Sequence, residues 1–142
     1  MNCFNSAALL YSLCGGSIVG TLYWKRIYDY AEPQDGFRIL ADRLWPRGIT
    51  KTKAAVDVWE KDITPSSPLR QAYHKGEIDY THFAALYAQE LAGNPAMPGF
   101  IESLKAHLTT GNVTILFAAK EPEKSHIPTL RAYIEAALMK QN

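Results

Sequence analysis

The sequence predicts an α/β fold, with a small, mainly parallel sheet flanked by helices in a single layered domain. Two runs of consecutive apolar residues, within residues 37–44 and 113–119, indicate strands that are buried on both faces. Segments with the apolar spacing of amphipathic helices follow both runs, an alternation typical of parallel sheets. A chain of 142 residues is long enough to build one such domain around a single core.

The amino-terminal segment differs from the rest of the chain because its first 24 residues carry no charged side chain. Residues 7–19 have the length of the apolar part of a signal peptide, but no basic residue precedes them and a glycine cluster interrupts them. They are also too few to span a membrane. We therefore expect residues 1–21 to form an apolar extension and residues 22–142 to form the domain.

The first half of the domain contains two predicted strands and one predicted helix. Within residues 21–27, the side chains of Leu22, Trp24 and Arg26 alternate with those of the residues between them, and the segment is rich in β-favouring residues, which predicts a strand. Residues 28–36 contain turn formers, and residues 37–44 are predicted to form the second strand. Thr50 is a suitable N-cap for a helix that ends at Pro65. This helix is predicted from three apolar residues at helical spacing, which are Val56, Trp59 and Ile63.

The second half of the domain contains four predicted helices and one predicted strand. A short helix is expected to begin at Ser66, and Asp79 can cap a longer one whose apolar stripe is Phe83, Leu86, Tyr87 and Leu91. A further helix begins near Pro98, and residues 113–119 should be the central strand. The last helix starts near Pro128 and is expected to bury Leu130, Tyr133, Ile134, Ala137 and Leu138. The amino-terminal segment is the candidate for a fourth strand.

Charge and cysteine content narrow the possible functions. The formal net charge is only +1, which argues against binding of nucleic acid through a broad basic surface, although a local arginine cluster can still hold one phosphate. Both cysteines lie within the first 14 residues, so the domain must fold without a disulfide, as is typical of cytoplasmic proteins. The four histidines show no metal-ligand spacing, and the sequence points to no metal, no membrane association and no particular cofactor.

Polar residues that can bind an anion follow both buried strands. The sequence DRLWPRG at the end of the first run supplies Asp42, Arg43, Trp45, Arg47 and Gly48. The second run is followed by Lys120, Glu121, Ser125 and His126. Because parallel sheets bind ligands beyond the carboxyl ends of their strands, we expect these residues to share one rim if the two strands are neighbours.

The side chains at this rim can bind an anion, stack on a ring or act in acid–base catalysis. The arginines and Lys120 can bind a phosphate or carboxylate, and Trp45 can stack on a base or another ring. Glu121 and His126 are the candidate catalytic pair, because histidine titrates near neutral pH and a rim glutamate can be shifted towards it. Structural roles compete with these functions. An acid and an arginine after a strand can form an ion pair, a tryptophan can pack under the next helix, and a histidine can cap a helix.

The stretches RIYDYAEPQDGFRILADRLWPRGITK, TPSSPLR and QEL closely resemble the YeaO-like family of uncharacterised bacterial and archaeal proteins, whose domain is the domain of unknown function 488. The similarity runs from about Leu22 to Met139. Members of the broader superfamily carry an Asp-Val-Arg-like triplet, a Pro-Arg-Ser-like turn and a Cys-His-Arg step. The resemblance places the last step at Ser125 to Ile127, where serine replaces the cysteine and isoleucine replaces the arginine. The resemblance therefore implies a pocket that lacks the reactive cysteine thiolate of the superfamily.

Two classes of function follow from these residues. The first is a small cytoplasmic enzyme or ligand-binding domain whose pocket holds an anionic, nucleotide-like molecule. The alternative is a nucleic-acid-binding or regulatory protein that places the same arginines on phosphates, which predicts a contiguous basic surface and a steep salt dependence. A protein-interaction module anchored by Trp45 is a further possibility, and an exposed apolar patch beside that residue would favour it.

Overall fold

The computed structural model describes residues 12–13, 16–17 and 20–140. Within these ranges, four parallel strands form one sheet in the order β3 (Leu22–Arg26), β6 (Val113–Phe117), β4 (Phe37–Leu40) and β5 (Val58–Trp59). Strand β6 is the last in the chain but lies inside the sheet, where it pairs with both β3 and β4. The α/β class and the central position of β6 are thereby confirmed.

The fourth strand of this sheet does not come from the amino-terminal segment. There, β1 (Ser12–Leu13) and β2 (Gly16–Ser17) form a separate antiparallel pair. The fourth strand is instead β5, at the edge of the sheet beside β4, in a segment whose sequence predicts a helix. Much of the predicted extension, including residues 1–11, lies outside the described residues.

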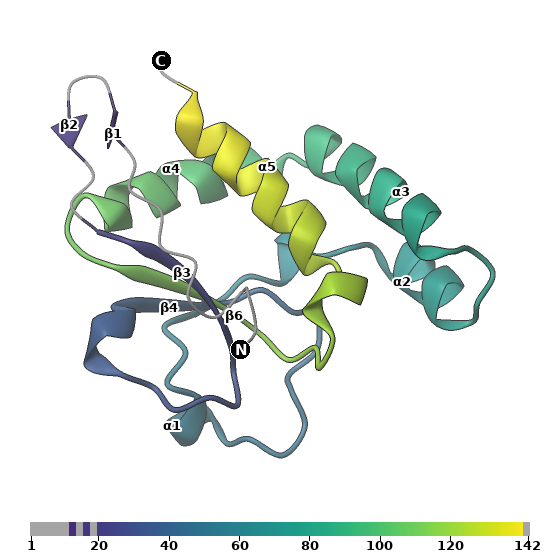
Figure 1. Ribbon diagram of the computed structural model, residues 1–142, viewed down its shortest axis with the longest axis horizontal. Coiled ribbons are helices and arrows are strands. Elements are labelled where there is room, and N and C mark those ends of the chain that lie inside the picture. The colour runs from purple at the N-terminus through teal and green to yellow at the C-terminus, as the bar shows by residue number, and fades with distance from the viewer. Residues whose placement is uncertain (1–11, 14–15, 18–19, 141–142) are drawn as a thin grey trace.

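Five α-helices of the described residues connect and cover the strands, as Figure 1 shows. They are α1 (Lys51–Ala54), α2 (Ser67–His74), α3 (Tyr80–Gly93), α4 (Ala96–Leu108) and α5 (Ile127–Met139). Three short 3₁₀ turns complete the described elements: η1 (Pro33–Asp35), η2 (Lys61–Ile63) and η3 (Pro122–Lys124). None of the described helices combines the length and apolarity that crossing a bilayer requires.

The helices begin where side chains can satisfy their free backbone N–H groups. The side-chain oxygens of Thr50, Ser66 and Asp79 accept hydrogen bonds from the first turns of α1, α2 and α3. Helices α2 to α5 bury their apolar faces against one side of the sheet, and the residues between these helices and the sheet form the larger core. Helix α1 lies on the opposite side (Figure 1), with a smaller apolar cluster.

The helix predicted from Thr50 to Pro65 is wrong beyond its first turn. Helix α1 ends at Ala54, and Ala55 adopts a left-handed conformation with a φ of 50°, which turns the chain back into β5. Arg38 stabilises this turn, because its guanidinium donates to the carbonyl oxygens of Ala54 and Ala55. Val56 and Trp59 pack against the smaller cluster on the α1 side of the sheet, whereas Ile63 belongs to the larger core on the other side.

Two further predictions are wrong in detail. Strand β4 ends at Leu40 rather than continuing to residue 44, because the side chains of Asp42 and Arg43 bind the segment that follows β6 and the segment before α2. Leu86 does not belong to the buried stripe of α3, since the residue is 41% exposed. The buried residues of α3 recur at every fourth position and are Phe83, Tyr87 and Leu91.

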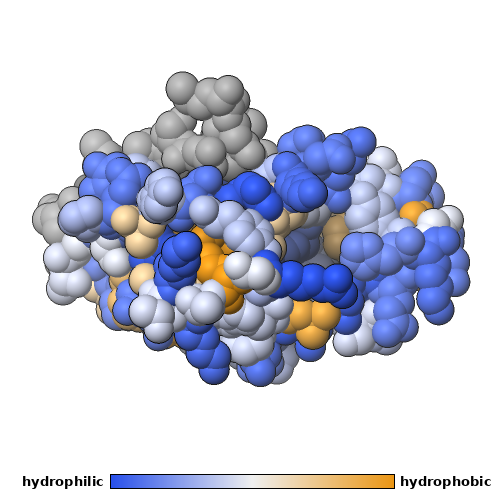
Figure 2. All heavy atoms as spheres, turned by 90° about the horizontal axis from the view of Figure 1, so that it is seen from below, coloured by the Kyte–Doolittle hydropathy of each residue, from blue (hydrophilic) through white to orange (hydrophobic). Residues whose placement is uncertain are grey.

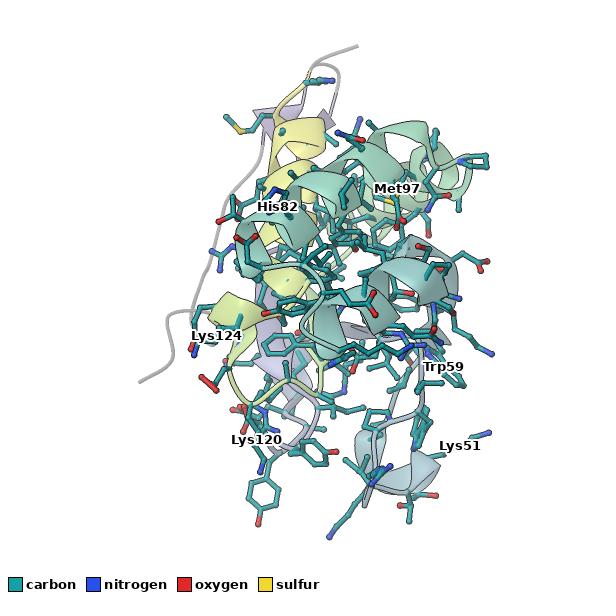
Figure 3. All side chains as sticks on the ribbon, turned by 90° about the vertical axis from the view of Figure 1, so that its right-hand side faces the viewer. Lys51, Trp59, His82, Met97, Lys120 and Lys124 are labelled. Atoms are coloured by element: carbon teal, nitrogen blue, oxygen red, sulfur yellow. The ribbon has the colours of Figure 1, made fainter. Side chains whose placement is uncertain are left out.

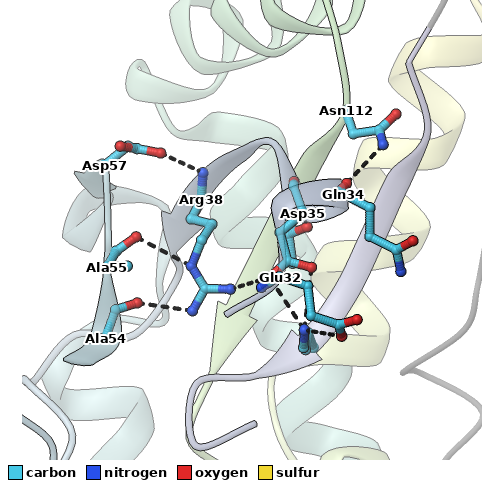
Figure 4. Close-up of polar contacts among 10 residues, drawn as sticks. Glu32, Gln34, Asp35, Arg38, Ala54, Ala55, Asp57 and Asn112 are labelled. Carbon is cyan, nitrogen blue, oxygen red and sulfur yellow. Dashed lines mark hydrogen bonds and ion pairs between the residues drawn. The ribbon is translucent and has the colours of Figure 1, made fainter. Parts of the chain in front are cut away.

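A cluster of buried charges lies on the α1 side of the sheet (Figure 4). The exposed fractions of Lys25, Asp35 and Arg38 are only 8%, 3% and 4%. The Asp35 carboxylate binds Lys25 Nζ at 3.2 Å and also the Arg38 guanidinium, while Thr114 Oγ1 donates to the Asp35 carbonyl oxygen over 2.8 Å. The cluster joins β3, η1, β4 and β6. It also confirms that β4 is buried on both faces.

Candidate ligand-binding cleft

The ends of β4 and β6 lie side by side, as the sequence predicts. Leu40 pairs with Leu116, and the Ala41 N–H donates to the Leu116 carbonyl oxygen over 2.9 Å. The residues that follow each strand therefore leave the sheet at the same edge. Arg26 supports this edge from β3, because its guanidinium donates to two carbonyl oxygens in the segment after β6.

A cleft of about 500 Å³ opens at this edge, between the strand ends, helix α2 and the loop before α5. A hollow is visible on this side of the molecule in Figure 2. The volume falls within the range of small-molecule binding sites. The cleft is lined by six residues singled out from the sequence, which are Asp42, Arg43, Lys120, Glu121, Ser125 and His126. Its other described lining residues are Leu44, Thr64, Pro65, Arg70, Tyr73, His74, Phe83, Ala119 and Lys124.

Asp42 connects the two strand ends. Its Oδ2 atom accepts the Ala118 N–H over 2.9 Å, and its Oδ1 atom lies 3.7 Å from His126 Nε2. Burial raises the pKa of Asp42 above its ordinary value, whereas His126 and the Ala118 N–H act in the opposite direction. The side chain is only 14% exposed, so its charge is poorly solvated.

His126 is held by the backbone of the neighbouring strand. Its Nε2 atom lies 2.6 Å from the Ala41 carbonyl oxygen, which can only accept a hydrogen bond, so Nε2 carries a hydrogen. In the neutral ring the other nitrogen, Nδ1, is then a hydrogen-bond acceptor. The ring packs edge-on against Tyr87, with 6.0 Å between the ring centroids. The side-chain cap considered from the sequence is not formed.

Ser125 uses its hydroxyl to order the start of α5. The Oγ atom donates to the Pro122 carbonyl oxygen over 2.7 Å and accepts the Ile127 N–H over 3.1 Å. Pro128 has no N–H to offer in the same turn. The start of α5 therefore has few free donors for an anion, and the cations of the cleft matter more.

Three cationic side chains of the cleft have no carboxylate partner among the residues that the structure describes. Arg43 donates from Nε to the carbonyl oxygen of the residue before Ser66, at 3.1 Å. Arg70 has a buried Nε atom without a hydrogen-bond partner in those residues, and Lys120 forms no ion pair there. The fourth cation, Lys124, pairs with the exposed Glu121 over 3.3 Å.

Trp45, Arg47 and Gly48 are not among the described residues that line the cleft. The Trp45 indole packs edge-on against Trp59, with ring centroids 5.5 Å apart, and donates to a backbone carbonyl oxygen. The Trp59 indole donates in turn to the Asp42 carbonyl oxygen over 2.7 Å, and in the view of Figure 3 Trp59 lies on the right and Lys120 on the lower left. These contacts support the structural interpretation of Trp45, in which it packs beneath the segment that follows its strand.

One wall of the cleft could not be recognised from the sequence. Arg70, Tyr73 and Phe83 come from α2 and α3, which are distant in the chain from both strand ends. Tyr73 stacks on Phe83 with centroids 4.4 Å apart, and its hydroxyl donates to the Lys124 carbonyl oxygen over 2.8 Å. The available signal is weak: Leu69 and Tyr73 give α2 an apolar face that must pack somewhere, and Arg70 lies beside it.

The fold and the cleft define the class of protein, a small α/β domain with a ligand-sized cleft at the carboxyl edge of a parallel sheet. Within the described ranges, no group of three or more His, Cys, Asp and Glu side chains could hold a metal ion. Residues 21–142 match the family model described as the inactive DUF488-N3 subclade, and the chain belongs to this family. The resemblance to YeaO-like proteins is confirmed.

The relatives are themselves uncharacterised proteins. The chain is 41% identical over 112 residues to YeaO of Escherichia coli (strain K12), which covers 79% of this chain and 95% of that protein. It is 35% identical over 105 residues to Mb3100c of Mycobacterium bovis and to Rv3073c of Mycobacterium tuberculosis, covering 74% of this chain and 86% of each. No solved structure matches the chain significantly.

Proposed function

We propose that this chain is a ligand-binding domain whose cleft holds a small anionic, nucleotide-like molecule in the cytoplasm. The observation that carries the proposal is the surplus of positive charge at the cleft. Arg43, Arg70 and Lys120 line it without a carboxylate partner in the described residues. Arg43 and Arg70 are partly buried, whereas Lys120 is exposed. Partly buried cations without a carboxylate partner are unfavourable, and an anion that forms charge-assisted hydrogen bonds with them removes that penalty.

Several contacts favour binding over catalysis. Glu121 is exposed and ion-paired, and one ring nitrogen of His126 is committed to a backbone carbonyl oxygen. Ser125 stands where the resemblance places a cysteine, and its hydroxyl orders the loop before α5. The description of the subclade as inactive agrees with this proposal.

Isothermal titration calorimetry at low ionic strength tests the proposal with three probes: adenosine monophosphate, phenyl phosphate and benzoate. We expect wild-type protein to bind at least one of them. Arg43→Ala should weaken that binding about tenfold or more, because a hydrogen bond to a charged group contributes about 1.5–3 kcal/mol. Arg47→Ala is the matched control, since it removes the same charge from an exposed side chain outside the cleft.

Two outcomes would contradict the proposal. Either no probe binds to the wild-type protein, or Arg43→Ala and Arg47→Ala weaken binding equally. Equal weakening, together with steeply salt-dependent binding of a DNA or RNA oligonucleotide, would favour the nucleic-acid-binding alternative.

A further inference from the structure

The guanidinium groups of the two arginines in the cleft differ in which N–H donors lack a hydrogen-bond partner among the described residues. Arg43 uses its Nε atom on a backbone carbonyl oxygen, which leaves its terminal nitrogens without a partner in the described residues. Arg70 has no such commitment, since neither its buried Nε atom nor its terminal nitrogens have a partner there. Buried donors without an acceptor are rare in folded proteins, and Arg70, which carries this one, lines the cleft.

The free donors suit a tetrahedral group better than a planar one. One guanidinium edge supplies two parallel N–H groups, which are enough for both oxygens of a carboxylate. Arg43 and Arg70 come from different elements, the segment after β4 and helix α2, so their edges belong to two separate supports. A phosphoryl group presents three acceptor oxygens that point in different directions, so it can bind both arginines at once.

The charge of the cleft matches the same group. Four cationic side chains and two carboxylates are among its described lining residues, which leaves two positive charges uncompensated. A phosphomonoester carries about 1.5–2 negative charges at neutral pH because its second pKa is about 6, whereas a carboxylate carries one. Lys120 adds charge at the rim without the directional preference of an arginine.

Part of the cleft wall is apolar. Leu44, Pro65, Tyr73 and Phe83 contribute to it, and Leu44 is 66% exposed, whereas Phe83 is buried. The Tyr73 and Phe83 rings stack with an angle of 18° between their planes. A flat apolar group would remove this surface from water, whereas inorganic phosphate would leave it uncovered.

We propose that the ligand is a phosphomonoester of a flat apolar group. Its phosphoryl oxygens bind Arg43 and Arg70, and its flat group lies against the apolar wall that includes Leu44 and Tyr73. This inference rests on the proposed function of the cleft and specifies the chemical class of its ligand.

Calorimetry with phenyl phosphate, benzoate and inorganic phosphate, at neutral pH, tests the inference. Phenyl phosphate should bind at least about tenfold more tightly than either of the others. Arg70→Lys keeps the charge but removes the fork of parallel donors, so it should weaken phenyl phosphate about tenfold and change benzoate by less than about twofold. Arg47→Lys, outside the cleft, should change neither affinity.

A second variant keeps the inference testable if Arg70→Lys does not fold, which thermal unfolding followed by circular dichroism would reveal. Leu44→Ser changes an exposed side chain and should leave the fold intact. It should weaken phenyl phosphate several-fold and leave the affinity for inorganic phosphate unchanged.

Each contrary outcome identifies what is wrong. If benzoate binds as tightly as phenyl phosphate, the phosphoryl assignment is overturned while the cleft remains an anion site. If inorganic phosphate binds as tightly, the flat apolar group is overturned. If no probe binds to the wild-type protein, the proposed function itself fails.

Discussion

Asp42 combines a hydrogen bond with a poorly solvated charge, and mutation can separate the two. Asp42→Ala leaves the Ala118 N–H without its acceptor and should lower the free energy of unfolding by about 1–3 kcal/mol. Asp42→Asn keeps an acceptor oxygen and removes the charge that burial disfavours, so it should be at least as stable as the wild type at neutral pH. Urea unfolding measures both variants. Equal losses in both would show that the charge, rather than the hydrogen bond, stabilises this edge.

The same residue predicts a dependence of stability on pH. Burial raises the native pKa of Asp42 above its ordinary value of 3.8, so the native state holds this proton more tightly than the unfolded state. The stability that this protonation contributes is present in acid and is lost as the pH rises from 3.8 through the native pKa. Over this interval, Asp42→Asn should gain stability relative to the wild type. A relative loss would mean that His126 lowers the pKa more than burial raises it.

The sequence predicts the cleft residues that directly follow strands better than those on helices. Asp42 and His126 are predictable, because the carboxyl ends of neighbouring parallel strands must meet at one edge. Arg70 is not, since its position depends on the contact of Tyr73 with a loop 51 residues further along the chain. Trp45 misleads because an indole suits ligand stacking and packing against another side chain equally well.

At the scale of elements, mutation of two glycines with positive φ, Gly36 and Gly48, measures how closely the loop before β4 packs against its neighbours. A Cβ atom at Gly36, where φ is 66°, would lie 2.0 Å from the Asn112 carbonyl oxygen, whereas one at Gly48, where φ is 78°, would meet open space. Alanine is strained at either position because φ is positive, and more so at Gly36, whose ψ of −131° lies outside the left-handed helical region. Gly36→Ala must also separate the loops before β4 and β6, so its melting temperature should fall much further than that of Gly48→Ala. Similar melting temperatures would show that these loops separate easily.

We expect the charge cluster of Figure 4 to stabilise the packing of α1 against β4. Arg38→Met leaves the buried Asp35 without one of its two cations and leaves two carbonyl oxygens at the end of α1 without donors. We expect a loss of about 3–5 kcal/mol in the free energy of unfolding, as is typical when one partner of a buried pair is removed. Arg47→Met, on an exposed side chain, is the control and should change stability by less than about 0.5 kcal/mol. A loss below 1 kcal/mol in Arg38→Met would place the cluster among exposed, weak ion pairs.

Periodicity predicts the elements whose residues keep one environment along their length. Strand β6 is buried throughout, and α3 begins at the cap predicted from Asp79. The segment between Thr50 and Pro65 is mispredicted because its turn depends on Arg38, a residue from another strand. Strand β5 has only two residues, too few for an alternating pattern to be visible.

At the scale of the molecule, residues 20–142 should fold as an independent domain. Gly20 belongs to this domain, because its N–H donates to the Leu108 carbonyl oxygen and it packs closely against residue 111. A chain shortened to residues 20–142 should therefore unfold cooperatively, with a melting temperature close to that of the full chain by circular dichroism. A chain shortened further, to residues 27–142, lacks β3 and should not fold. Loss of cooperative unfolding in the first variant would show that the extension contributes to the core.

The position of β6 has a consequence for how the protein is made. Strands β3 and β4 leave the ribosome early, yet each pairs in the sheet with β6, which is translated only after residue 112. Until then β3 lacks its described partner and β4 can pair only with the two-residue strand β5, a state that favours aggregation and recruits chaperones. Completion of the sheet depends on contacts between distant parts of the chain, so folding is late and slow compared with a helical bundle of this size. Premature termination before β6 would release a polypeptide in which β3 lacks its described partner and β4 keeps only β5.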